Sequence, residues 1–307
     1  MSLEQFLDDL ADPAATVPLS DFVEVSDLLP EELGMFARTW FGIPVERQRW
    51  FVSNMVELAE NNPELDFGAI FKMCLKDRDE EVLESAMEGL WEHEDRVIIP
   101  SLVQILHSDK GAQVRAAAAV ALGKFPVLVQ EGKLLPKDGD SVHDSLIEII
   151  EDPNQPLEVT RRSLEAVAPF NTQDIRRLVA KAYESDDLKL KSSSIYAMGR
   201  TGETSWLPVL IKELQSQEPD IRYETAHACG ELGEEDAVPH LIALLEDDDY
   251  LVQLAGVSAM GKIGGPLAKK VLVNCVKEGD AVLEEAARAE LENIEFLEDP
   301  MAFTSEV

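Results

Sequence analysis

A short sequence pattern recurs along this chain at intervals of about 31 residues. Its clearest copy is 221–233, an apolar residue, a basic residue, a run rich in small residues, and glycines nine and twelve positions after the start. The same frame begins at the apolar residues Val82, Val114, Val159, Leu190, Val252 and Val282. Repeats of this length are typical of stacked helical hairpins, so the chain is predicted to be all-α.

Because each repeat packs only on its neighbours, the 307 residues need no division into conventional domains. We expect a right-handed alpha-alpha superhelix of about eight helical hairpins over residues 30–297. Residues 1–29 are rich in acids and are expected to form a loosely held N-terminal arm. Residues 298–307 are expected to fray as a C-terminal tail.

Prolines mark the hairpin starts and one interruption. Pro100, Pro208 and Pro239 lie in matching register and are expected in the first turn of a helix, where proline is tolerated. Between Val114 and Val159 the spacing lengthens to 45 residues, and the stretch 126–140 holds two prolines and two glycines. This stretch is predicted to be an inserted loop, either flanking a binding face or tolerated at the surface.

Counting the first apolar residue of the frame as zero, positions 0, 4 or 5, 8 and 11 are apolar or small and should face the neighbouring helix. Glycines at position 9 should permit close helix packing. Basic residues at position 1, such as Arg222, are expected to bridge acids near the helix starts, and Asp187, Glu218, Asp220 and Asp249 are the candidates. This ladder is interpreted as structural.

Positions 2, 3 and 6 are left to face the inner surface of the curve, where solenoids bind ligands. Exposed tyrosines beside small residues are typical of protein-binding surfaces. The predicted partner-binding residues on this concave face are Ser193, Tyr196, Tyr223, Glu224, His227 and Ser258. The alternative is that Tyr196 and Tyr223 only pack between neighbouring helices.

Charge and cysteine usage narrow the ligand classes. The chain has 27 basic and 60 acidic residues, a net charge of −33, which repels phosphate backbones, so we expect no nucleic-acid ligand. The acidity fits a solvated surface, a basic partner or a high-salt cytoplasm. The cysteines Cys74, Cys229 and Cys275 are far apart in sequence, so neither a disulfide framework nor a zinc site is predicted.

Targeting signals are not evident. No basic residue precedes Arg38, which argues against a secretory or transit peptide, and no uninterrupted apolar run reaches membrane-spanning length. A cytoplasmic protein without membrane contact is therefore expected.

The frame copies at 190–202, 221–233 and 252–264 resemble HEAT repeats of the short kind called phycobilisome lyase HEAT-like, over about Pro30 to Phe296. The resemblance implies a HEAT-like solenoid. It leaves function open, since such repeats serve bilin lyases, an iron hydroxylase, a DNA glycosylase and adaptors.

The similar family that hydroxylates deoxyhypusine carries His-Glu pairs at positions 2 and 3, which hold two irons. Here those positions read Tyr223-Glu224, Ser192-Ser193 and Leu254-Ala255. Glu224 and His227 alone would supply two ligands where a diiron bundle uses six. We therefore predict that the protein has no cofactor and no metal. The predicted function is that of a non-enzymatic scaffold or adaptor that binds a protein partner, and a basic partner would suit the acidic surface. An enzyme or enzyme subunit related to bilin lyases or hydroxylases is the alternative.

Overall fold

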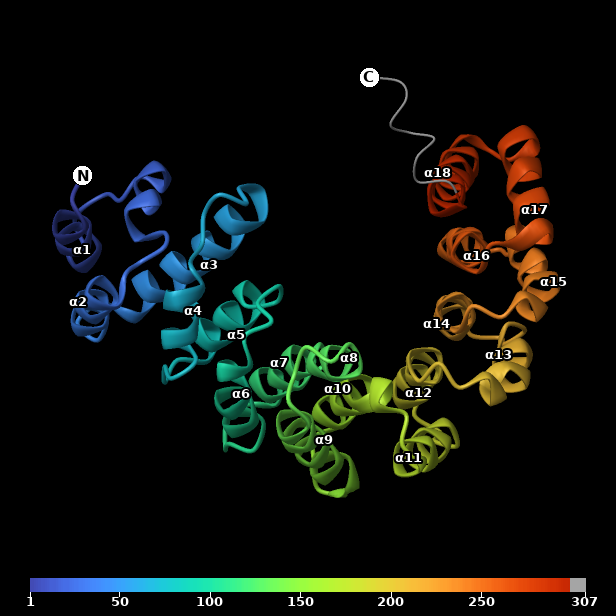
Figure 1. Cartoon of the computed structure of the whole chain (residues 1–307), viewed down its shortest axis with the longest axis horizontal. Coiled ribbons are helices and arrows are strands. Elements are labelled where there is room, and N and C mark those ends of the chain that lie inside the picture. Colours follow the sequence, from blue (N-terminus) through green and yellow to red (C-terminus); the bar gives the residue numbers. More distant parts are fainter. Residues whose placement is uncertain (299–307) are drawn as a thin grey trace. The chain divides into compact units, whose positions relative to one another are not determined.

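The computed structural model of the chain describes residues 1–298, which form 18 α-helices, several short 3-10 helices and no strand (Figure 1). The chain divides into two compact units, Met1–Ser163 (unit 1) and Leu164–Val307 (unit 2). The predicted all-α, HEAT-like repeat architecture is confirmed. That the array runs without division from 30 to 297 stays a prediction, and the predicted tail 298–307 lies outside the described residues apart from Glu298.

Unit 1 contains three complete hairpins, a helical N-terminal segment and most of a fourth hairpin. Its helices are α1 (Leu3–Ala11), α2 (Pro30–Trp40), α3 (Val45–Asn61), α4 (Gly68–Cys74), α5 (Glu80–Gly89), α6 (Ile99–Leu106), α7 (Ala112–Leu122), α8 (Phe125–Gln130), α9 (Pro136–Glu151) and the first residues of α10 (Leu157–Val167). The second helices α3, α5 and α7 pack side by side, each on the next. We call them the second-helix row of unit 1.

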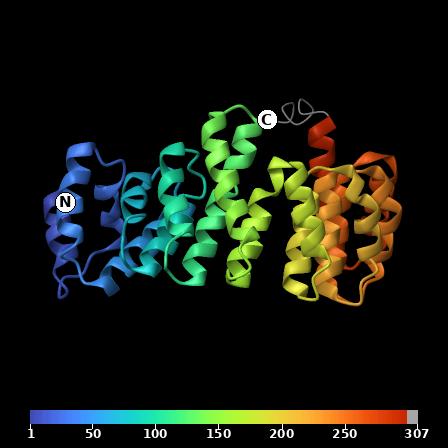
Figure 2. The same cartoon turned by 90° about the horizontal axis from the view of Figure 1, so that it is seen from below.

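Unit 2 repeats the arrangement with four hairpins (Figures 1 and 2). Its helices are the rest of α10, α11 (Gln173–Tyr183), α12 (Leu188–Arg200), α13 (Leu207–Glu213), α14 (Pro219–Leu232), α15 (Val238–Leu241), α16 (Tyr250–Ile263), α17 (Gly265–Glu278) and α18 (Ala281–Glu298). The helices α12, α14, α16 and α18 form its second-helix row. Counting α9 with α10, the described residues form the eight predicted hairpins.

The repeated frame builds the core as its periodicity predicts. Its first residue is fully or almost fully buried in α5, α7, α10, α14 and α16. Glycines at position 9 bring the second helices together, because a Cβ on Gly199 would lie 2.7 Å from the Cα atom of Ala228. The last frame begins one residue later than predicted, since Leu283 is buried and Val282 is half exposed.

The register prolines begin helices as expected. The helices α6, α13 and α15 each have a proline at their first or second position, and each follows a short 3-10 turn. Those turns are η2 (Arg96–Ile98), η4 (Thr204–Trp206) and η5 (Glu235–Ala237). Proline lacks only an amide that the first helical turn leaves unpaired.

The N-terminal segment is not a loosely held arm. Helix α1 and the 3-10 helix η1 (Leu19–Val25) insert Phe6 and Phe22 fully into the core, and both rings contact Phe51 of α3. Arg47 also donates hydrogen bonds to the Asp9 and Ala15 carbonyls at 2.8 and 3.0 Å. The segment is therefore a cap that covers the apolar faces of the first hairpin, which would otherwise meet water.

The insertion at 126–140 is not a loop either. Pro126 and Pro136 each lie in the first turn of a helix, α8 and α9, so these prolines begin helices here as they do elsewhere. Leu128 is buried, and α8 packs on α9 where Gly139 leaves room for Val129. The extra residues add a short helix and lengthen α9, so the predicted flanking loop is wrong.

The segment Ala112–Gln130, comprising α7 and α8, is the one stretch among residues 1–298 long and apolar enough to cross a membrane by length and composition. Half of its apolar window is buried inside the protein. Because α7 packs on both α5 and α6, its apolar residues serve the core of unit 1.

Candidate functional site

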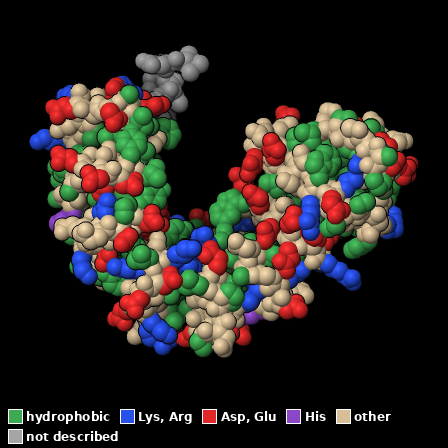
Figure 3. Space-filling view, turned by 180° about the vertical axis from the view of Figure 1, so that it is seen from behind, with side chains coloured by type: hydrophobic (Ala, Val, Ile, Leu, Met, Phe, Trp, Pro, Cys, Tyr) green, Lys and Arg blue, Asp and Glu red, His purple; other side chains and the backbone are tan. Residues whose placement is uncertain are grey.

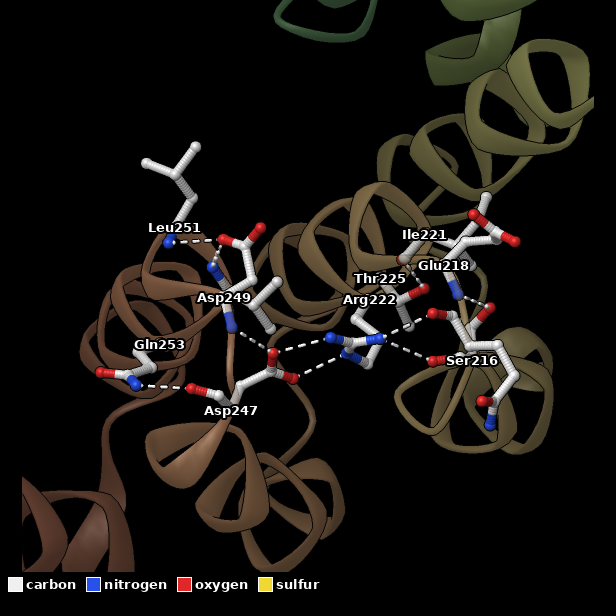
Figure 4. Close-up of polar contacts among 11 residues, drawn as sticks. Ser216, Glu218, Ile221, Arg222, Thr225, Asp247, Asp249, Leu251 and Gln253 are labelled. Carbon is white, nitrogen blue, oxygen red and sulfur yellow. Dashed lines mark hydrogen bonds and ion pairs between the residues drawn. The ribbon is translucent and has the colours of Figure 1, made fainter.

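The bases at position 1 of the frame hold neighbouring repeats together. Nε and Nη2 of Arg222 donate to the two carboxylate oxygens of Asp247 at 2.6 and 2.7 Å, and Nη1 donates to the Ser216 carbonyl at 2.8 Å (Figure 4). The two charged side chains are only 15% and 8% exposed. The hydrogen bond from Arg222 holds the pKa of Asp247 below its usual value.

The predicted ladder therefore exists, but its acids are different. Asp249, a predicted partner of a base, instead caps α16 by accepting hydrogen bonds from the amides of Leu251 and Val252. Lys191 pairs with the buried Glu213 at 2.8 Å. These basic side chains form ion pairs within the fold. The opposite side of the second-helix row of unit 2 is open to solvent.

A cavity of about 300 Å³ opens on that solvent-facing side in unit 2. It extends over α12, α14 and α16, and its lining residues are Tyr196, Arg200, Tyr223, Glu224, His227, Ala228, Glu231 and Lys262. The structure thus brings four of the six predicted partner-binding residues to one cavity: Tyr196, Tyr223, Glu224 and His227.

Two tyrosines dominate the exposed surface of this cavity. Tyr196 is 39% and Tyr223 is 38% exposed. The Tyr223 ring meets the His227 ring edge-on, with 4.6 Å between ring centroids. Burial, together with the positive charge of Lys262, lowers the pKa of His227, so the imidazole is neutral near pH 7.

The charges around the cavity largely compensate one another. Glu231 accepts from Nζ of Lys262 at 2.6 Å and from Nη1 of Arg200 at 3.3 Å. Burial acts to raise the pKa of Glu231, but the bond from Lys262 and both positive charges lower it overall. The cavity accordingly has an exposed aromatic surface, and the positive and negative charges at its border offset one another.

Two predicted site residues do not belong to the cavity. Ser193 is buried, and its hydroxyl donates to the Glu165 carboxylate at 2.6 Å, so a partner cannot reach it. At position 3 of its frame, Ser193 is thus directed toward Glu165 of α10, the preceding second helix. Ser258 is half-buried on α16 and is not among the lining residues.

Arg200, Glu231 and Lys262 line the cavity and were not predicted. They share position 10 of three successive frames, one helical turn beyond position 6 and on the same face. A charged residue recurring directly after the position 9 glycine was the available signal.

Unit 1 contains a larger cavity, of about 740 Å³, on its second-helix row. The apolar part of its lining comes from α5, from α7 and from the turn that follows α5. It comprises Met87, Trp91, Ala116, Ala117, Val120 and Ala121. The polar part comprises Glu60, Glu84, Glu88, Gln113, Glu158 and Arg162. Half of these twelve residues occupy frame positions 2, 3 or 6. The same frame positions therefore line a cavity in unit 1, although none of the predicted partner-binding residues lies in this unit.

Acidic side chains are spread over the face shown in Figure 3, with Lys and Arg interspersed. Within residues 1–298 there is no group of three or more His, Cys, Asp or Glu placed to hold a metal ion. Glu224 and His227 are thus two cavity residues without further ligands of this kind.

Comparison with known families matches residues 207–292 to a model described as HEAT repeats. Comparison with curated proteins gives no match. The matched region covers the last three hairpins, where the 31-residue frame is most regular.

Solved structures share the fold at low identity. A Kap121p mutant is 15% identical with a TM-score of 0.53, covering 95% of this chain and 37% of that one. The complex of CpcE and CpcF of phycocyanin lyase from Nostoc sp. PCC7120 is 22% identical with a TM-score of 0.46, covering 67% and 80%. Human deoxyhypusine hydroxylase in complex with glycerol is 20% identical with a TM-score of 0.37, covering 95% and 96%. At these identities the likeness concerns fold alone.

Proposed function

We propose that this HEAT-like repeat protein is a non-enzymatic scaffold that holds a protein partner on the solvent-facing side of its second-helix rows. The observation that carries the proposal is the pair of exposed rings, Tyr196 and Tyr223, at a cavity on three packed helices. Tyrosine offers a large amphipathic contact area at low entropic cost, which is why it is frequent among residues that dominate binding energies.

The helices that carry these rings are packed rigidly. A rigid surface favours binding without rearrangement of the protein. Gly199 and Gly230 bring α12, α14 and α16 into close contact, and the Arg222–Asp247 pair ties α14 to the segment before α16. A site whose side chains are held by such packing loses little conformational freedom when a partner binds. Both tyrosines are therefore presented at fixed spacing on adjacent repeats.

The charge of the protein selects among partners. With a net charge of −33, the protein attracts basic surfaces and repels phosphate backbones. The unit 2 cavity is itself nearly balanced, because Arg200 and Lys262 offset Glu224 and Glu231. A protein partner is thus the proposed ligand, and nucleic acid is not.

The test compares the wild type with a Tyr196→Ala, Tyr223→Ala double variant. Partners are first captured from native lysate and identified by mass spectrometry, and the affinity of the purified partner is then measured. Loss of one exposed aromatic anchor costs about 1–2 kcal/mol of binding free energy, so we expect a combined loss of roughly 2–4 kcal/mol. Circular dichroism should be unchanged, because both rings are partly solvent-exposed.

The matched control replaces Leu188 and Val273 by Ala. These side chains are also exposed but lie outside the cavity. The control should bind as the wild type does. Equal affinity of the wild type and the double tyrosine variant would contradict the proposed site.

A further inference from the structure

We infer that the unit 1 cavity binds a segment of a partner protein that has an apolar anchor side chain flanked by lysine or arginine. The inference rests on the proposed function only in that the ligand is a protein. It concerns a different unit and a different ligand chemistry from the tyrosine cavity. Three features of the lining carry it: a small-residue floor, an exposed tryptophan and unpaired carboxylates.

The floor of the cavity is apolar and is lined mainly by small side chains. Ala116, Ala117, Val120 and Ala121 lie on one face of α7, and the short alanine side chains leave the volume open. Val120 is 38% exposed in the middle of this face. The cavity, about 740 Å³, lies within the range of sites that enclose a ligand group, so a large apolar side chain fits.

Trp91 borders the cavity, and its backbone is held in place. Nζ of Lys124 donates hydrogen bonds to the carbonyls of Leu90 and Trp91 at 2.5 and 3.1 Å, which fixes the turn after α5. The Trp91 side chain is nevertheless 56% exposed. An indole ring of this kind packs an apolar anchor on its surface and attracts a cation over its face.

Three of the four acids of the border lack cationic partners, whereas the fourth, Glu158, pairs with Arg161 and Arg162. Glu60 on α3 and Glu84 and Glu88 on α5 make no ion pair with any residue in 1–298, in contrast to the acids of the unit 2 cavity. Burial and the like charges of Glu80 and Glu81 raise the pKa of Glu84. Cationic side chains of a ligand would relieve this repulsion.

Arg162 on α10 is the basic residue of the lining, and its Nε donates to the Glu158 carboxylate at 3.0 Å. Glu84 and Glu88 are one helical turn apart and face the same side of α5, beside the floor on α7. The arrangement is therefore complementary to an apolar side chain with positive charges on its flanks.

The probe is a pair of fluorescein-labelled synthetic peptides of 12 residues. Both carry one central Phe in an alanine and serine background; one has four Lys around it and the other has four Glu. Fluorescence anisotropy with the full-length protein should show binding of the lysine peptide, weakening by more than tenfold between 20 and 300 mM NaCl. The glutamate peptide should show no binding.

The key variant replaces Glu60, Glu84 and Glu88 by Gln, and its matched control replaces Glu57, Glu92 and Glu148 by Gln. Each variant removes three negative charges, but the control residues lie on or beside α3, α5 and α9 outside the lining. We expect roughly tenfold weaker binding of the lysine peptide for the key variant only. Trp91→Ala should weaken binding about thirtyfold.

Several results would overturn the inference. Equal binding of both peptides, or equal weakening by the key and control variants, would show that the carboxylates of the border do not select the ligand. No binding of the lysine peptide would contradict the site itself. Dimerisation of the protein that Trp91→Ala abolishes would show instead that a second copy covers the cavity. None of these results bears on the tyrosine cavity of unit 2, whose test uses a different partner and different variants.

Discussion

At the level of single residues, the Arg222–Asp247 pair in unit 2 is a bidentate ion pair. Both groups are largely removed from water, and each is satisfied by the other and by backbone groups. Forming a buried ion pair of this kind adds little net stability. Removing one partner is strongly destabilising, because the other charge is then buried alone.

We predict that Arg222→Ala lowers the free energy of unfolding by about 3–5 kcal/mol, measured by urea denaturation. The exposed Arg288–Glu284 pair provides the control, since Arg288→Ala should change stability by less than about 0.5 kcal/mol. Similar small losses for both variants would show that the Arg222 pair is not desolvated.

The same pair gives a pH dependence. Because the folded-state pKa of Asp247 lies below 3.8, its stabilising contribution is complete above pH 3.8 and is lost as the pH falls through the folded-state value. The wild type should therefore lose stability on acidification below pH 3.8 more steeply than Asp247→Asn. Parallel acid-unfolding curves of the two proteins would contradict this assignment.

At the element scale, the second-helix row depends on helices that approach at their glycines. Gly199→Ala should destabilise unit 2 by about 1–3 kcal/mol, because the new methyl group meets the Ala228 backbone, which cannot move aside. Gly34→Ala in α2, where the nearest atom is 3.7 Å away, should instead stabilise the protein by about 0.5–1 kcal/mol. Thermal unfolding distinguishes the two signs, and a gain from both substitutions would show that the helices are not in close contact.

The N-terminal segment gives a second prediction for an element. Phe22→Ala should cost about 3–5 kcal/mol, because the ring is fully buried against Phe6 and Phe51. Val23→Ala, at a neighbouring but exposed position, should have little effect. If both variants unfold at the same urea concentration as the wild type, residues 1–29 are a loosely attached arm after all.

The elements also show where sequence reasoning succeeds and where it fails. Regular hairpins were predictable, because burial at positions 0, 4 or 5, 8 and 11 is set within each repeat. The N-terminal cap and the insertion at 126–140 do not follow the frame, and their acid content and prolines on their own predict irregular structure. Apolar spacing at Leu3, Phe6, Leu7 and Leu10 was the signal for helix α1.

The candidate site was predictable where the position of a residue on one face of its own helix determines whether it is exposed. Positions 2 and 6 of the frame give Tyr196, Tyr223 and His227, and all three line the unit 2 cavity. Ser193 was misplaced because its burial depends on Glu165 in the neighbouring repeat, which no single frame encodes. For the same reason Asp247, which pairs with Arg222, was not among the four candidate acids.

At the scale of the whole molecule, the net charge of −33 acts on every element at once. Like charges that are not paired repel one another in the compact state, and salt screens this repulsion. Raising NaCl from 20 to 500 mM should therefore increase the free energy of unfolding by roughly 1 kcal/mol. A decrease with salt would mean that ion pairs such as Arg222–Asp247 outweigh the repulsion.

We propose that a protein partner binds at the tyrosine cavity of unit 2, and site-specific photo-crosslinking tests this proposal. A benzophenone amino acid is introduced at position 223 and, as control, at position 273 on α17, where Val273 is as exposed as Tyr223. Irradiation in cells of the native source should give one discrete crosslinked protein from position 223 and none from 273. Crosslinks from both positions alike, or from neither, would contradict the account.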